Sequence, residues 1–233
     1  MDRAIEAYRA AQQTTDRDLR LQMFEKSARL FVAAAERGPA SAELWANAGT
    51  AALQAERLGE AVLYLRRALA IDPNLRRARQ NLDHARGLLP GWVPLPRDHR
   101  VLDDFLGARL TREERRGFAS LAFLLGALLA AAGIARRNGL ARSMALLPLA
   151  VWALLLGSSL IASPETAARE AVVMVEVPAR AADSFNAPLR FADPVPAGTE
   201  VTVETERARW ARVLFADGQD AWLPRSAIAP IEE

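Results

Sequence analysis

The residues best suited to chemistry in this chain are its two histidines, His84 and His99. Asp98, Asp103 and Asp104 lie near His99, and carboxylates beside an imidazole can bind a metal ion or move a proton. Neither histidine has a second histidine or paired carboxylates at ligand spacing, so a solvated polar linker is the simpler interpretation. The sequence also lacks cysteine, a P-loop, a dinucleotide-binding G-x-G-x-x-G and the H-E-x-x-H and G-x-S-x-G motifs. We therefore predict that the protein is not an enzyme and needs neither a cofactor nor a metal.

The charge balance argues against a nucleic-acid partner. The chain has 30 basic and 28 acidic residues among 233, which gives a net charge of +2. A slight arginine excess spread along the whole chain does not form the basic face that nucleic acids require.

The first 89 residues are predicted to be helical, with breaks near residues 14–16, 38–39, 59 and 72–73. Six residues between positions 42 and 75 have the spacing of a tetratricopeptide repeat: Trp45, Gly49, Ala61, Leu65, Ala68 and Pro73. The small residues allow two antiparallel helices to cross closely, and the proline stops the second helix. One repeat cannot bury its own apolar face. We therefore assign residues 1–89 to a repeat domain, with a degenerate repeat over about 8–41, the clear repeat over 42–75 and a capping helix over 75–89.

The resemblance to tetratricopeptide repeats implies a groove, lined by the first helix of each unit, that binds an extended peptide or a partner protein. The matching polar positions here are Gln12, Asn47, Thr50, Arg77 and Asn81. Asn47 and Arg77 correspond to two positions that hold a C-terminal carboxylate in some relatives, although the other positions of that clamp do not match. Polar residues on a solvated helix face are the alternative for each of them.

Two apolar runs in the middle of the chain predict a transmembrane hairpin. Residues 117–135 and 144–162 contain no charged residue, and each approaches the length of about 20 residues that spans a bilayer. The loop over 136–143 carries three arginines. A linker and an amphipathic helix over residues 90–116 precede the hairpin, and Trp92 is expected either at the membrane interface or on the repeat domain. A helical hairpin buried in a globular core is the alternative.

From residue 171 the pattern changes to short alternating strands separated by turn residues. About five strands within sixty residues suit a small barrel, and Asp217-Gly218 indicates a tight hairpin. Trp210-Ala-Arg-Val213 and Asp217-Gly218 followed by Trp222 resemble a bacterial SH3-like (SH3b) domain over residues 171–233. Some SH3b domains bind cell-wall peptides, which makes Arg180, Phe185 and Trp210 candidate ligand residues. A core position is the alternative for Trp210.

The expected fold class is a multidomain membrane protein with an all-α tetratricopeptide domain, a transmembrane helical hairpin and a small all-β SH3-like barrel. This order resembles the BatE-type proteins of bacterial aerotolerance operons. The resemblance implies a bacterial inner-membrane protein with two spans, both soluble domains on the periplasmic side, and partners among von Willebrand factor A-domain membrane proteins and a MoxR-type ATPase. Arginines near the spans, three in the loop against five outside, favour the cytoplasmic side instead.

Two functions follow from these expectations. The first is a non-catalytic, membrane-anchored adaptor that binds partner proteins through the groove and the SH3b domain, in a complex linked to stress or aerotolerance. The alternative is a cell-envelope sensor or anchor that binds peptidoglycan peptides through the SH3b domain.

Overall fold

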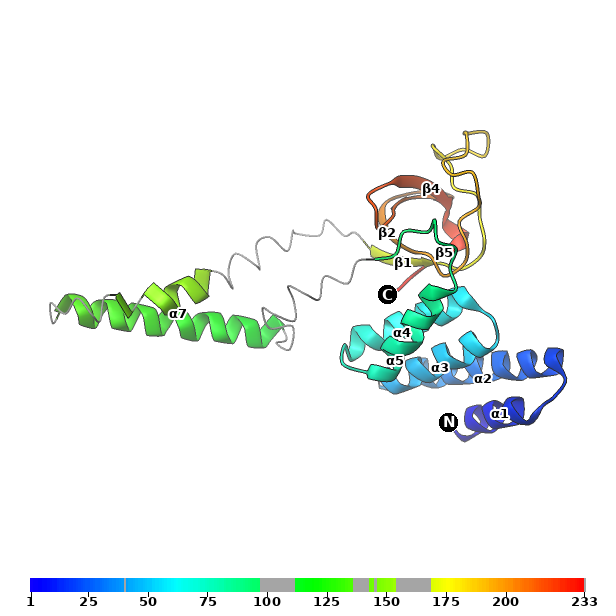
Figure 1. Ribbon diagram of the computed structural model, residues 1–233, viewed down its shortest axis with the longest axis horizontal. Helices are drawn as coiled ribbons and strands as arrows, with labels where there is room; N and C mark the ends of the chain where they lie inside the picture. The colour runs from blue at the N-terminus through cyan, green and yellow to red at the C-terminus, as the bar shows by residue number, and fades with distance from the viewer. Residues whose placement is uncertain (40, 97–111, 136–142, 145, 154–168, 233) are drawn as a thin grey trace. The chain divides into compact units, whose positions relative to one another are not determined.

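A computed structural model describes residues 1–39, 41–96, 112–135, 143–144, 146–153 and 169–232 (Figure 1). The chain separates into two compact units. One combines residues 1–97 with 167–233, and the other comprises residues 98–166.

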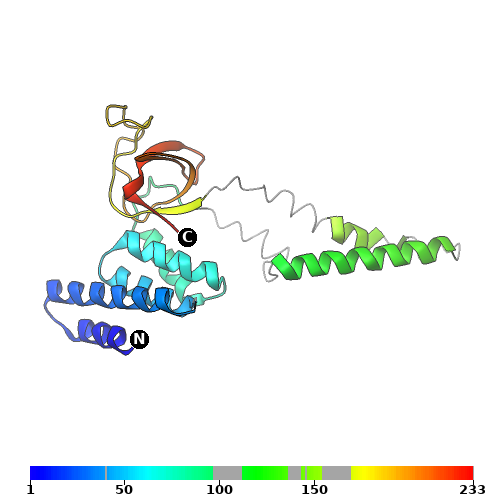
Figure 2. The same ribbon diagram turned by 180° about the vertical axis from the view of Figure 1, so that it is seen from behind.

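The first unit begins with antiparallel helices that lie side by side in chain order (Figures 1 and 2). Asp16 and Ser41 cap the second and third helices, because their side chains accept hydrogen bonds from the N–H groups of Leu19 at 2.9 Å and Leu44 at 3.4 Å. We call this set of helices the helical array; its members are α1 (Asp2–Gln13), α2 (Arg17–Arg37), α3 (Ala42–Gln54), α4 (Leu58–Ile71) and α5 (Arg76–Gly87).

Small side chains bring these helices close together. Ala4, Ala7 and Ala11 form the buried stripe of α1. The buried hydroxyl of Ser27 donates to the carbonyl oxygen of Ala4 at 2.8 Å, which ties α2 to α1. A Cβ on Gly49 would lie 2.6 Å from Cγ of Leu65, so α3 and α4 cross at a point where no side chain larger than hydrogen fits. The array therefore packs by close helix contact more than by large core residues.

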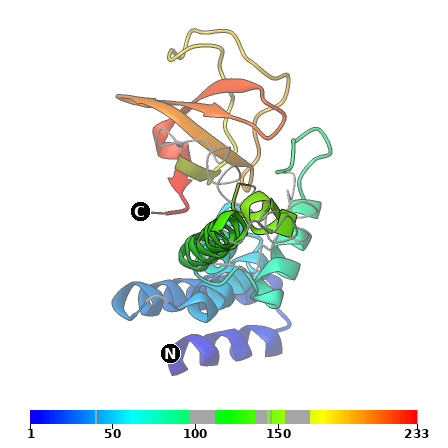
Figure 3. The ribbon, with the colours of Figure 1, turned by 90° about the vertical axis from the view of Figure 1, so that its left-hand side faces the viewer.

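The second part of this unit is a five-stranded antiparallel sheet with the strand order β4-β3-β2-β1-β5. Its strands are drawn as arrows coloured from yellow-green to red in Figure 3. Its interior holds Val173, Val195, Val213 and Leu223, which are fully buried. We call residues 169–231 the β-module. Its elements are β1 (Arg169–Val173), β2 (Glu200–Arg207), β3 (Trp210–Leu214), β4 (Asp220–Pro224), a 3-10 turn (Arg225–Ala227) and β5 (Ile228–Pro230).

A long connection between β1 and β2 folds back on itself and reaches the far edge of the sheet. Val177 pairs with Val195, and Arg180 pairs with both Leu189 and Trp222 of β4. The residues at the tip of this connection are thereby brought beside β3 and β4.

The array and the β-module share one hydrophobic cluster. Val172 of β1 and Ile231 pack into the cluster that contains Leu65 of α4 and Leu82 of α5. This contact was not predicted from the sequence, which suggested two separate small domains.

The predicted transmembrane hairpin, and with it the membrane-protein fold class and the two-span inner-membrane localisation, is wrong. Within the described part of the chain, no helix has both the length and the apolar character needed to cross a bilayer. The helix that covers the first apolar run is α7 (Arg112–Ala135), whose 24 residues open with five consecutive charged residues.

The second apolar run is described only in part. Residues 143–144 and 146–153 are helical. Residue 145, residues 154–162 and the arginines of the loop lie outside the described residues. Residues 146–153 pack on α7, where Leu149 covers Gly126 and the rings of Trp152 and Phe123 lie 5.2 Å apart.

The connector that leaves α5 packs against the β-module. Val93 is buried, and the ring of Trp92 lies 5.9 Å from that of Phe191 in the β1–β2 connection. The ring of Trp92 thus contacts the β-module, a position that the sequence analysis did not consider. The amphipathic helix expected before α7 lies outside the described residues.

Candidate recognition site

Four of the five predicted groove residues meet across α3 and α5. The Nη2 atom of Arg77 donates to Oδ1 of Asn47 at 2.9 Å, and Nδ2 of Asn81 donates to Oγ1 of Thr50 at 2.8 Å. We call these four residues the recognition face. Two side-chain hydrogen bonds, one for each pair, thus join α3 and α5 at this patch.

Helix geometry explains why these side chains come together. Arg77 and Asn81 are four residues apart and Asn47 and Thr50 three apart, so each pair shares one side of its helix. The adjacent side of α5 is apolar and buried, with Ala78, Leu82 and Ala85 against the array. Burial of that stripe fixes the rotation of α5 and turns its polar side toward α3.

Tyr8 places α1 near this patch. Burial raises the pKa of the Tyr8 hydroxyl above its ordinary value of 10.0, while the positive charge of Arg77 opposes that shift. Tyr8 also packs on Phe24 of α2, with ring centroids 5.1 Å apart. The fifth predicted residue, Gln12, is exposed on α1, and no hydrogen bond between described residues joins it to the recognition face.

Arg77 already has an acidic neighbour. Its Nη2 atom lies 2.7 Å from Oε2 of Glu43, which also belongs to α3. A ligand carboxylate at this position would have to compete with Glu43. The sequence analysis did not include Glu43, although its place four residues before Asn47 puts it on the same side of α3.

The predicted structural residues of the repeat lie around the α3–α4 crossing. Ala61, Leu65 and Ala68 are fully buried, and Pro73 follows the end of α4. The ring of Trp45 lies 5.6 Å from that of Tyr64 and carries the guanidinium of Arg67 at 5.0 Å.

Two of the three predicted ligand residues of the β-module lie together. The rings of Phe185 and Trp210 are 4.8 Å apart and inclined by 57°. Phe185 is 61% exposed, whereas Trp210 is 7% exposed and covered. The side chain of Arg180 instead donates to the carbonyl oxygen of Ala187 at 2.7 Å and so braces its own loop.

A second cation–aromatic contact beside this pair was missed. The guanidinium of Arg207 lies 5.3 Å over the ring of Trp222 and 3.2 Å from Oδ2 of Asp183. No sequence pattern indicates it, because it depends on the β1–β2 connection returning to the strands. Phe185, Trp210, Arg207 and Trp222 form what we call the aromatic face.

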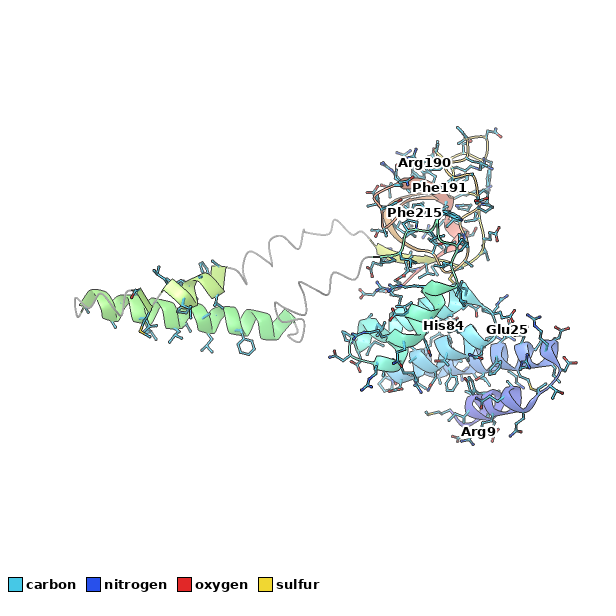
Figure 4. The ribbon with its side chains drawn as sticks, viewed as in Figure 1. Arg9, Glu25, His84, Arg190, Phe191 and Phe215 are labelled. Carbon is cyan, nitrogen blue, oxygen red and sulfur yellow. The ribbon has the colours of Figure 1, made fainter. Side chains whose placement is uncertain are left out.

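The histidines do not form a site in the described structure. His84 is exposed on α5 (Figure 4), and His99 with the three nearby aspartates lies outside the described residues. Among the residues that are described, no three His, Cys, Asp or Glu side chains gather closely enough to hold a metal ion.

Comparison with known proteins adds no relative: no family model, no curated protein and no solved structure matches the chain.

Proposed function

We propose that the chain is a non-catalytic scaffold that binds a segment of a partner protein on the recognition face. The observation that supports this function is the hydrogen-bonded patch of Asn47, Thr50, Arg77 and Asn81, since these positions were selected from the repeat pattern alone. Residues that are distant in sequence meet at the place where a repeat array would present a ligand.

The chemistry of the patch suits an extended peptide. Two carboxamides and a hydroxyl can each donate and accept hydrogen bonds, so they match both the N–H and the C=O groups of an unpaired backbone. Arg77 adds a fixed positive charge beside them. Because Glu43 balances that charge, the patch favours polar backbone contacts over capture of a strongly acidic ligand.

Binding to purified candidate partners tests the proposal. The resemblance to aerotolerance-operon proteins makes soluble domains of von Willebrand factor A-domain proteins and a MoxR-type ATPase the first candidates. Isothermal titration with the wild type should give saturable binding, and the Asn47→Ala/Asn81→Ala variant should weaken it at least tenfold, about 1.4 kcal/mol.

The control is Arg29→Ala, because Arg29 is highly exposed on α2 and belongs to neither face. Equal affinity of the double alanine variant and the wild type for a partner that binds would reject the recognition face as the site.

The aromatic face supports a second candidate function, the binding of cell-wall peptides. An exposed phenylalanine packed against a covered tryptophan is the kind of apolar platform on which ligands pack. Sedimentation of the full chain with purified peptidoglycan should then depend on Phe185, and Phe185→Ser should leave the protein in the supernatant. The exposed Leu189→Ser variant serves as the control. Failure of the wild type to sediment would reject this function.

A further inference from the structure

Helix α5 contributes to both the recognition face and the junction with the β-module. Its first half supplies Arg77 and Asn81 to the recognition face, and its last turn supplies Arg86 to the junction with the β-module. It is also the last helix of the array, and within the array it packs mainly on α3 and α4.

The junction holds Arg86 by a bidentate ion pair. Its Nε atom lies 2.7 Å from Oε2 of Glu200, and its Nη2 atom lies 2.9 Å from Oε1. The two side chains are 9% and 6% exposed. Arg66 of α4 adds a third group, with its Nε atom 3.1 Å from Oε1 of Glu200. A carboxylate of the β-module is thus shared between the last two helices of the array.

Glu200 is itself firmly placed. It is the first residue of β2 and stands opposite Val172 in the β1–β2 ladder. Val172 and Ile231 pack into the cluster that contains Leu82 and Ala85 of α5. The β-module therefore offers α5 both an apolar contact and a fixed anion.

We propose that Glu200 is a positioning residue for the recognition face: by holding Arg86 it fixes α5, and α5 then keeps Arg77 and Asn81 aligned with α3. The biological meaning of this coupling rests on the proposed function. Its test does not, because the position of α5 is measured without a ligand.

The position of α5 depends on this ion pair because α5 is the terminal helix of the array and is weakly supported by the other helices. In a repeat array each element is stabilised mainly by its neighbours, and the last one lacks a neighbour on one side. Neutralising Glu200 takes away the bidentate partner of the buried Arg86, and the 3.8 Å contact with the exposed Asp83 of the same helix does not replace it. The least costly relief is local opening of α5, which returns Arg86 to water.

Amide hydrogen exchange of the full-length Glu200→Gln variant tests this coupling. Exchange of the α5 amides over residues 79–86 should be at least about tenfold faster than in the wild type, while α1 and α2 should keep their protection. Glu204→Gln is the matched control, because it removes the same charge from β2 but its side chain faces Arg212 at 3.6 Å instead of the array. That control should leave α5 unchanged.

A conservative variant covers the case in which Glu200→Gln does not fold. Arg86→Lys keeps the charge and loses the bidentate geometry, so it should give a smaller but still selective acceleration in α5. Unchanged exchange in α5, or an equal acceleration in all five helices, would overturn the proposal, since the second result indicates only a loss of global stability. A chain that shows the selective effect yet binds no partner would reject the proposed function and leave the coupling intact.

Discussion

Gly59 of α4 lies directly against the backbone of Met174 in the β-module. A Cβ at position 59 would lie 2.8 Å from the carbonyl oxygen of Met174 and 2.9 Å from its Cα. Backbone atoms cannot rotate away as a side chain can. The closest approach of the array to the β-module therefore requires glycine at this position.

Gly59→Ala is consequently expected to destabilise the protein even though alanine is the better helix former. Overpacking against fixed atoms costs about 1–3 kcal/mol, which exceeds the gain of up to about 1 kcal/mol in helix propensity. Chemical denaturation should show the loss. Gly87→Ala is the control, because a Cβ at the end of α5 meets nothing within 4 Å, and it should be neutral or stabilising. A Gly59→Ala protein as stable as the wild type would contradict this contact.

Gly198 and Gly218 allow the effect of backbone strain to be separated from that of crowding. Both have positive φ, +92° and +87°, but a Cβ on Gly198 would lie 2.9 Å from Cγ of Leu58 whereas Gly218 faces open space. Alanine at either position costs about 1–2 kcal/mol in backbone strain.

We expect Gly198→Ala to cost more than Gly218→Ala by about 1 kcal/mol, because it also pushes Leu58 of α4 away. Denaturation midpoints of the two variants provide the comparison. In a Leu58→Ala background the difference should disappear, and its persistence would show that Leu58 is not the obstacle.

Local signals explain why much of the helical array could be predicted. The breaks expected at residues 14–16, 38–39 and 72–73 coincide with the gaps between α1 and α2, α2 and α3, and α4 and α5. The break expected at Gly59 is misplaced. The chain turns at residues 55–57, where Glu56 has φ of +61°, and Gly59 already belongs to α4. Gly59 itself lies inside the helix, where its small size is needed for contact with the β-module.

Long-range contacts explain what the sequence did not reveal. Arg86 and Glu200 are 114 positions apart. In the helical pattern Arg86 is one of several charged residues opposite an apolar stripe, and nothing local distinguishes it from an exposed arginine. The recognition face was easier to predict, because the repeat spacing alone selects the polar sides of α3 and α5.

Ile231 links the stability of the β-module to that of the array. It is 5% exposed within the cluster of α4 and α5, and Arg67 donates to its carbonyl oxygen at 3.1 Å. Ile231→Ala should therefore cost about 2–4 kcal/mol and shift the unfolding of both parts together.

Single-tryptophan versions report the two parts separately, with Trp45 in the array and Trp222 in β4. The control is Ile71→Ala at the end of α4, where the isoleucine is 43% exposed and the cost should stay below about 1 kcal/mol. A shift seen only by Trp222 would mean that Ile231 stabilises the β-module alone.

The titration of Tyr8 reports the position of Arg77. The chain has two tyrosines, so a Tyr64→Phe protein leaves Tyr8 as the only phenol. Burial raises the pKa of Tyr8 above 10.0, and Arg77 partly offsets this by favouring the phenolate. Because the folded pKa is the higher one, the folded state holds the proton more tightly. The associated stability is complete below pH 10 and is lost as the pH rises through the folded pKa.

Arg77→Gln in the Tyr64→Phe protein should therefore move the titration midpoint of Tyr8 further upward, as followed by phenolate absorbance. It removes the charge that opposes the effect of burial. Arg76→Gln removes the same charge from the neighbouring position of α5, and Arg76 is not among the groups that act on Tyr8. The Tyr8 titration midpoint of the Arg76→Gln variant should match that of the Tyr64→Phe protein. Identical midpoints for the two arginine variants would mean that Arg77 does not face Tyr8 of α1.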